Sequence, residues 1–252
     1  MFQENSLKDK RILVTGASSG IGRACAQMFA ACGAQLLICG RDQERLLATL
    51  SSLHGKEHKM LLCDLDGSDH VVELIQDHVR DAESLDGILH AAGISMVRPV
   101  KLSKEKQFDE VFTSSIKSAV ALARAASLKG VMNNGGSITL MSSVAAVRGQ
   151  AGMSLYSSAK AAIEGLSRSL AVEFAPRGIR VNAIAAGAVK TEMHARLVQG
   201  LSPESVAEYE GKHLLGFGEA IDIAHAATFM MSDAGRWMTG ASLVLDGGYT
   251  VR

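Results

Sequence analysis

The sequence has 252 residues, with 26 basic and 26 acidic side chains and a formal net charge of zero. With charges balanced and aromatic residues at only 4%, it lacks the electrostatic and stacking surface that nucleic-acid binding requires. No apolar run approaches the roughly 20 residues that span a bilayer. We therefore expect neither a nucleic-acid nor a membrane partner, and a single domain over residues 1–252.

The four cysteines, Cys25, Cys32, Cys39 and Cys63, show no Cys-x-x-Cys spacing, and no histidine pair has zinc-ligand spacing. We expect no metal site and buried free thiols, with Cys25 and Cys32 facing the core from one helix. Residues 1–10 are polar and lack the apolar segment of a secretory signal. Together these features predict a cytoplasmic protein.

Strand-like and helix-like runs alternate along the chain. Short apolar runs predict strands at 10–15, 34–39, 58–63, 85–91, 136–142, 179–185 and 241–245. Helical spacing of apolar residues predicts helices at 20–32, 42–53, 68–80, 103–129 (with or without a break), 155–175 and 219–232. This alternation predicts an α/β fold with a parallel sheet covered on both faces, in which ligands bind at the carboxyl ends of the strands.

The first predicted strand is followed directly by the run Thr15-Gly16-Ala17-Ser18-Ser19-Gly20-Ile21-Gly22, and a helix pattern follows. Glycines let the backbone turn tightly and approach a pyrophosphate, while a helix N-terminus offers free N–H groups. The order strand, glycine loop, helix indicates a dinucleotide site. A plain glycine-rich turn is the alternative interpretation.

The end of the second predicted strand decides the choice of cofactor. A carboxylate there would bind the ribose hydroxyls of NAD. Gly40 and Arg41 stand there instead, and Asp42 comes one residue too late. Because an arginine can pair with a 2′-phosphate, we predict NADP(H) over NAD(H), with NAD(H) kept open. The alternative is that Arg41 is only a solvated residue at a helix start.

Tyr156 and Lys160 are four residues apart in a helix pattern and share one face. An ammonium beside a phenol favours the phenolate, so we expect a lowered tyrosine pKa and proton transfer near neutral pH. Ser143, at the end of the predicted strand 136–142, is placed to hold the reacting oxygen. The three residues predict a proton-transfer site for an alcohol or carbonyl, although Tyr-x-x-x-Lys alone is a surface pair in many helices.

Together these motifs resemble the short-chain dehydrogenase/reductase family, over nearly the whole chain. The family's glycine motif matches Thr15, Gly16, Gly20 and Gly22, and its Ser, Tyr and Lys match Ser143, Tyr156 and Lys160. The tail from Thr239-Gly240 to Asp246-Gly247-Gly248 resembles the family's last strand and its flanks. The resemblance implies a Rossmann-like, doubly wound parallel sheet of about seven strands. It also implies hydride transfer between NADP(H) and a carbonyl or secondary alcohol.

The resemblance further implies where the cofactor binds. Asp64 would contact adenine, and Lys160 would bind the nicotinamide ribose as well as tune Tyr156. The full expected cofactor set is Gly16, Ser18, Ser19, Gly20, Ile21, Arg41, Asp64, Leu65, Ala92, Gly93, Tyr156, Lys160, Gly187, Val189 and Thr191. Family members commonly assemble through helices that match 103–129 and 155–175, so a homo-oligomer, tetramer or dimer, is expected.

Three positions depart from the family's pattern. Its Asn-Asn-Ala-Gly is His90-Ala91-Ala92-Gly93 here, and its Pro-Gly is Ala186-Gly187. Ser115 stands where the family usually places a fourth catalytic residue, an asparagine thought to hold a water linking the lysine to solvent. A serine has one donor hydrogen rather than two. Two other functions therefore stay open: a nicotinamide-nucleotide-binding protein with weak or lost catalysis, and a dehydratase or epimerase on the same fold.

The segment of residues 188–218 is long, is bounded by glycine and follows the end of a predicted strand. We therefore predict that it forms a substrate lid. His194 and His213 are expected at the surface, while Arg148 and Gln150 are candidates for orienting a substrate. A partly apolar pocket wall is expected from Met193, Leu197, Leu201, Tyr209, Leu214, Leu215 and Phe217, with Ala145, Ala146, Val147 and Met153 near Ser143.

Overall fold

The computed structural model describes residues 5–80 and 83–252 of the chain. Its main sheet contains β1 (Arg11–Thr15), β2 (Gln35–Gly40), β3 (Lys59–Leu62), β4 (Leu85–His90), β5 (Met132–Ser143), β6 (Arg180–Ala186) and β9 (Ser242–Leu245). The seven strands are all parallel and lie in the order β3-β2-β1-β4-β5-β6-β9. The direction in which strands are added therefore reverses between β1 and β4, the position where such sheets bind ligands. The predicted doubly wound, Rossmann-like sheet is confirmed.

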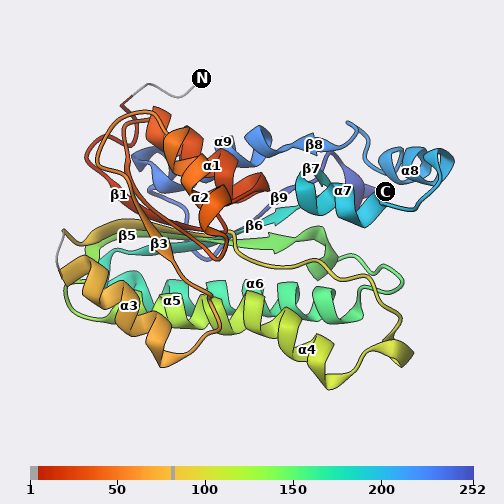
Figure 1. Cartoon of the computed structure of the whole chain (residues 1–252), viewed down its shortest axis with the longest axis horizontal. Coiled ribbons are helices and arrows are strands. Elements are labelled where there is room, and N and C mark those ends of the chain that lie inside the picture. The colour runs from red at the N-terminus through yellow and green to blue at the C-terminus, as the bar shows by residue number, and fades with distance from the viewer. Residues whose placement is uncertain (1–4, 81–82) are drawn as a thin grey trace.

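Helices cover both faces of this sheet (Figure 1). One face carries α1 (Gly20–Ala31), α2 (Gln43–Ser51) and α9 (Ala220–Met231). The other carries α3 (Asp69–Arg80), α4 (Glu105–Phe112), α5 (Ser118–Ser127) and α6 (Ser154–Phe174). Since both faces are covered, the strands are nearly continuous runs of buried residues, as parallel sheets require.

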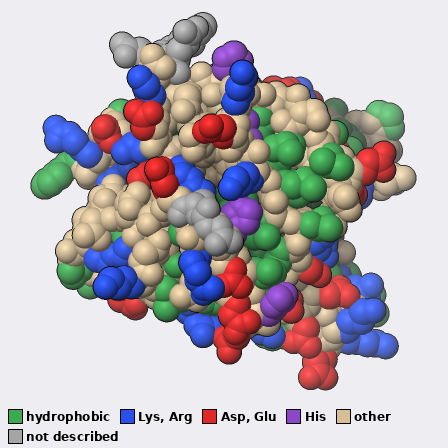
Figure 2. Space-filling view, turned by 60° about the vertical axis from the view of Figure 1, so that its left-hand side comes forward, with side chains coloured by type: hydrophobic (Ala, Val, Ile, Leu, Met, Phe, Trp, Pro, Cys, Tyr) green, Lys and Arg blue, Asp and Glu red, His purple; other side chains and the backbone are tan. Residues whose placement is uncertain are grey.

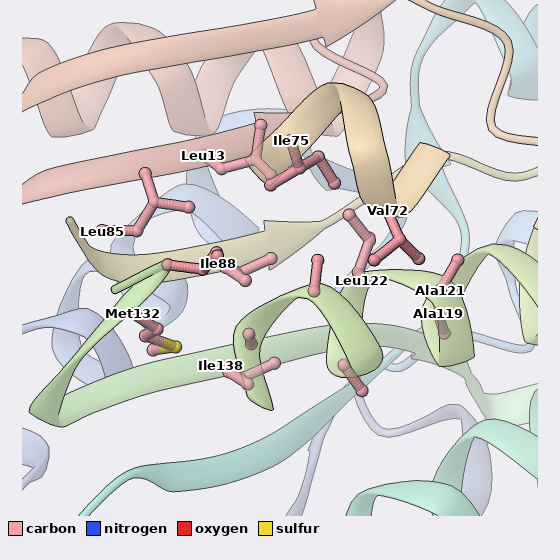
Figure 3. Close-up of a cluster of buried hydrophobic side chains, with 14 of the residues drawn as sticks. Leu13, Val72, Ile75, Leu85, Ile88, Ala119, Ala121, Leu122, Met132 and Ile138 are labelled. Atoms are coloured by element: carbon pink, nitrogen blue, oxygen red, sulfur yellow. The ribbon is translucent and has the colours of Figure 1, made fainter. Parts of the chain in front are cut away.

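The core is divided by the sheet into two apolar clusters. In one of them, Leu13 of β1, Ile75 of α3 and Leu122 of α5 meet with at most 1% of their surface exposed (Figure 3). Each such side chain contributes roughly 1.5–3 kcal/mol on burial. Cys25 and Cys32 lie in the second cluster, so their predicted burial is confirmed. All four cysteines are free thiols.

Two predicted elements differ from the structure in an informative way. Strand β5 begins at Met132, four residues before the predicted start, because Met132 pairs with Leu85 across an irregular register. The intervening Asn-Asn-Gly-Gly sequence is typical of a turn, which hid this pairing. The helix predicted at 103–129 consists of α4, a π-helical turn at Thr113–Lys117 and α5. The break is therefore a local widening of the helix, of a kind often found at functional sites.

The predicted lid, residues 188–218, contains regular structure that the sequence analysis did not identify. Short strands β7 (Val189–Lys190) and β8 (Gly218–Glu219) pair in parallel, and α7 (Glu192–Val198) and α8 (Pro203–Glu210) lie between them. The side chains of Thr191 and Ser202 cap the two helices, each accepting a backbone N–H at 3.2 Å. Figure 1 shows α7 and α8 together at one end of the molecule, beside the C-terminus. Movement of this segment as a lid stays a prediction.

The surface agrees with the balanced composition. Basic and acidic side chains are intermingled over the face shown in Figure 2. Within the described parts of the chain, no helix has both the length and the apolar character to cross a bilayer.

Candidate active site

The loop between β1 and α1 depends on glycine at two positions. Gly16 has φ of 66°, and a Cβ atom there would lie 2.7 Å from the Ala92 nitrogen. A Cβ atom at Gly22 would overlap the Gly16 carbonyl oxygen. Glycine therefore allows the loop to lie against the end of β4 and the start of α1, forming a cradle whose backbone a ligand can approach closely.

The start of α1 is suited to an anion. Ser19 occupies the N-cap position, but its side chain caps no backbone N–H, and the first turn of α1 contains no acidic residue. The backbone N–H groups of this first turn, of which the Gly20 N–H meets the Glu192 carboxylate, and the positive end of the helix dipole thus face the loop. A dinucleotide's diphosphate fits this cradle.

At the far end of the cradle, Arg41 and Asp64 lie together after β2 and β3. The guanidinium is 3.7 Å from the carboxylate, and both side chains are 68% exposed. An ion pair this exposed contributes little free energy, so Arg41 is free to turn toward another anion. Leu65, the neighbour of Asp64, is buried in the core.

Ser143, Tyr156 and Lys160 line one cavity of about 140 Å³ at the carboxyl ends of the strands. The predicted cofactor residues Ile21, Gly93, Gly187, Val189 and Thr191 line the same cavity. The structure thus brings together groups from β4, β5, α6 and the predicted lid. A larger hollow of about 490 Å³ lies at the amino ends of the strands, and none of these residues lines it.

The Ser143 hydroxyl is hydrogen-bonded to Tyr156 and accepts the Ala145 N–H at 3.2 Å. Lys160 is 6% exposed, and its ammonium donates to the Met141 carbonyl at 2.8 Å, 5.7 Å from the centre of the Tyr156 ring. The three side chains therefore converge from the end of β5 and one face of α6.

The expected lowering of the tyrosine pKa is wrong for this structure. Burial raises the pKa of Tyr156, and the hydrogen bond with Ser143 offsets only part of that rise. Burial also lowers the pKa of Lys160 to about 8, which weakens its positive charge above neutral pH. Helix spacing placed the two residues on one face, but it could not predict that the lysine would point at a backbone carbonyl.

Ser115 lies in the π-helical turn, fully buried, and its Oγ has no hydrogen-bond partner within the described residues. A Cβ atom placed on Gly93 would lie 3.9 Å from this oxygen and 3.6 Å from the Lys160 Nζ. The Ser115 hydroxyl and the Lys160 ammonium therefore border the same small space beside Gly93.

His90 links this region to the glycine loop, which the sequence analysis missed. Its Nδ1 lies 2.9 Å from the Thr15 hydroxyl oxygen, and its Nε2 lies 3.2 Å from the Ser115 carbonyl oxygen and 3.1 Å from the Ser118 hydroxyl. The Ser115 carbonyl can only accept, so Nε2 carries the hydrogen of the neutral ring, and Nδ1 accepts the Thr15 hydroxyl hydrogen while the Thr15 oxygen accepts the Ala92 N–H. His90 then donates from Nε2 to the Ser115 carbonyl. His90 and Ser115 both stand where the sequence departs from the family's pattern, and they are in contact although 25 residues separate them. That both positions depart from the pattern was the signal from which this contact could have been predicted.

The expectation of a surface position is wrong for His213, which is 3% exposed. Its Nε2 accepts the Ala188 N–H and its Nδ1 bonds the Tyr209 carbonyl, each at 3.2 Å. It packs with aromatic rings that separate lid segments contribute, so it ties the end of α8 to the start of the predicted lid. His194 is half-buried and lines the cavity, with its ring 4.6 Å from that of Phe217, and burial lowers its pKa.

Part of the predicted pocket wall lines this cavity. Met193, Leu197, Tyr209, Ala145 and Met153 line it, and Gln150 is its predicted polar contact. The side chain of Gln150 also donates to the Tyr249 hydroxyl. The remaining candidates do not line the cavity. Phe217 is buried among aromatic rings, and Arg148 donates to the Thr250 and Arg252 carbonyls. Ala146 lies outside the lining, and four apolar candidates are exposed: Leu201, Leu214, Leu215 and Val147.

Comparisons with known proteins cover nearly the whole chain. A family model described as enoyl-(acyl carrier protein) reductase matches residues 16–250. Carbonyl reductase family member 4 of Danio rerio is 32% identical over 94% of this chain and 96% of its own length. Glucose 1-dehydrogenase of Gluconobacter oxydans is 33% identical over 96% of this chain and 92% of its own. A structure from Beutenbergia cavernae, assigned as an NAD(P)-dependent gluconate 5-dehydrogenase and holding NADP at low occupancy, superposes with a TM-score of 0.90. It is 29% identical and covers 99% of this chain and 100% of its own.

The burial of His90 predicts a specific loss of stability in acid. Burial, together with the charge of Lys160, lowers the pKa of His90 from 6.5 to about 4. Between these values the unfolded chain binds more protons than the folded chain, so stability falls as pH falls through this window. From pH 7 to pH 5, His90 should account for a loss of about 2 kcal/mol.

Urea unfolding at the two pH values measures this effect. His90→Asn should remove the loss, whatever its own stability at pH 7. The exposed His54→Asn variant should retain it, as a control. An unchanged pH dependence in His90→Asn would contradict the assignment of a neutral, buried imidazole.

Proposed function

Because this chain belongs to the short-chain dehydrogenase/reductase family, and is thus an NAD(P)-dependent oxidoreductase, we propose that it moves a hydride between NADP(H) and a small-molecule carbonyl or secondary alcohol. One observation carries this proposal. Ser143, Tyr156 and Lys160 converge on a cavity that is also lined by the predicted cofactor contacts. A hydroxyl pair backed by a buried lysine provides proton transfer at the oxygen of the reacting carbon.

Each of the three residues has a defined task. The Ser143 hydroxyl holds the substrate oxygen. The Tyr156 hydroxyl gives that oxygen a proton during reduction and removes it during oxidation. Because burial raises the pKa of Tyr156, the phenol is protonated at neutral pH, the form that reduction requires. Lys160 places an ammonium beside the phenol and stabilises the phenolate that forms when the proton leaves.

The cofactor, when bound, supplies or accepts the hydride. We propose that the glycine loop and the start of α1 hold its diphosphate and that Asp64 lies beside its adenine. Arg41 would pair with a 2′-phosphate, which favours NADP(H) over NAD(H). The NADP in the Beutenbergia cavernae relative supports a nicotinamide cofactor of this kind.

The cavity favours an uncharged substrate with apolar flanks. Among the described residues, Lys160 is the one charged residue in its lining, and its ammonium donates to the Met141 carbonyl. A substrate carboxylate or phosphate would therefore be desolvated without a dedicated cation. Gln150, His194 and Tyr209 provide neutral hydrogen-bonding groups that can orient a ketone or hydroxyl.

The two other functions are less well supported. A pure binding protein needs no buried Tyr–Ser hydrogen bond with a lysine behind it. A dehydratase or epimerase would use the same three residues, so only substrate turnover separates it from simple oxidoreduction. We also propose a reducing cytoplasmic location, which the four free thiols support. Assembly as a tetramer or dimer stays a prediction, supported by the exposed Val172 on α6.

Tyr156→Phe should lower kcat by about 10²- to 10⁴-fold, because it removes the proton donor. The affinity for NADPH should stay within about twofold, since the ring remains in place. Stopped-flow turnover on a panel of ketones and NADPH fluorescence titration measure the two quantities. Turnover near the wild-type rate would exclude the proposed role of Tyr156.

The wild-type protein should have a higher kcat/KM with NADPH than with NADH. Arg41→Ala should reduce this ratio roughly 10- to 100-fold, as expected for a lost charge-assisted hydrogen bond. Arg45→Ala is a matched control, because Arg45 pairs with Asp42 at 2.8 Å on α2. A wild-type preference for NADH would refute the NADP(H) assignment.

Ser115→Asn should lower kcat by about tenfold. The serine is fully buried, so the larger amide has to displace its neighbours beside Lys160. The kcat–pH profile above pH 7 should change in the same variant, because the surroundings of Lys160 change. A large rate gain would instead show that serine cripples a site built for asparagine.

A further inference from the structure

The carboxylate of Glu192 sits on the anion cradle described above. Glu192 is the first residue of α7, in the predicted lid. Its Oε2 accepts the Gly20 backbone N–H at 3.0 Å, and its Oε1 lies 3.3 Å from the Arg23 guanidinium. Gly20 is the first residue of α1, so a lid residue 172 positions away supplies an anion to this helix terminus.

The side chain of Thr191, the residue before Glu192, also lies against the start of α1. A Cβ atom placed on Gly20 would lie 3.2 Å from both Cβ and Cγ2 of Thr191. Because the Ser19 side chain makes no cap hydrogen bond, Glu192 takes the place of the missing cap. The start of α7 is thus held against the glycine loop by the side chains of Thr191 and Glu192.

A dinucleotide would need the same donors. Its diphosphate and the Glu192 carboxylate are both anions that bind the N–H groups at the start of α1. Two like charges in one cradle repel each other, so they exclude one another.

We propose that Glu192 is a carboxylate latch that holds the predicted lid on the glycine loop and competes with the cofactor's diphosphate. Cofactor binding displaces the carboxylate and releases the start of α7. The inference rests on the proposed cofactor site, but it holds equally for NADPH and NADH, which share the diphosphate. The Arg23 and Glu192 side chains are 32% and 43% exposed, so the latch is weak enough to open readily.

Titration of Glu192→Gln with NADPH and with NADH tests the latch. The amide keeps the shape but loses the charge, so the Kd of whichever dinucleotide binds should fall about 3- to 10-fold. Adenosine 2′-monophosphate, which lacks a diphosphate, should bind the variant and the wild type equally. Glu208→Gln is the control. It removes a lid carboxylate on α8 that pairs with Lys212, just beyond that helix, at 3.2 Å, and it should leave every Kd unchanged.

Hydrogen exchange of the protein without added nucleotide gives a second readout. Backbone amides of residues 189–198 should exchange faster in Glu192→Gln than in the wild type or Glu208→Gln. Unchanged dinucleotide affinity together with unchanged exchange would overturn the latch. An equal gain in affinity for adenosine 2′-monophosphate would also overturn it, because general charge would then be the cause. A wild-type protein that binds NADH but not adenosine 2′-monophosphate would refute the NADP(H) assignment and leave the latch standing.

Discussion

The hydrogen bond between Thr15 and His90 joins the two halves of the sheet where the order of strands reverses. It links the last residue of β1 to the last residue of β4, at 2.9 Å and away from solvent. From Thr15 the chain enters the glycine loop, and from His90 a second bond reaches the π-helical turn that carries Ser115. A buried network of this kind is fully connected, so a change at one member moves the others. The cradle for the cofactor and the space behind Lys160 are therefore positioned by the same few bonds.

Much of the fold could be predicted from the sequence, because apolar periodicity reports burial directly. The predicted ends of the main-sheet strands differ from the observed ends by at most one residue, except at the start of β5. There, Asn-Asn-Gly-Gly is typical of a turn, yet the chain re-enters the sheet through Met132. In the predicted lid, the helices α7 and α8 are short and mostly exposed, so no apolar face marked them. Their signals were only the capping residues Thr191 and Ser202.

The residues of the candidate site could be predicted from the sequence, but the direction of their pKa shifts could not. Motif spacing named Ser143, Tyr156 and Lys160, and the structure places them around one cavity. The direction of the Tyr156 pKa shift could not be read from spacing, because it depends on burial. The buried position of His213 could not be predicted for a related reason. Its partners, the Ala188 N–H and the Tyr209 carbonyl, are backbone groups that no side-chain pattern reveals.

Helix α7 carries two neighbouring residues that lie at two different proposed binding sites. Glu192 contacts the glycine loop, where the cofactor is proposed to bind, while the next residue, Met193, lines the substrate side of the cavity. A rigid turn of helix cannot release one without shifting the other. If the carboxylate must leave before the dinucleotide enters, Met193 shifts with it, and the wall of the cavity changes when the dinucleotide binds. The two proposed binding sites would then be coupled through two adjacent residues of one short helix.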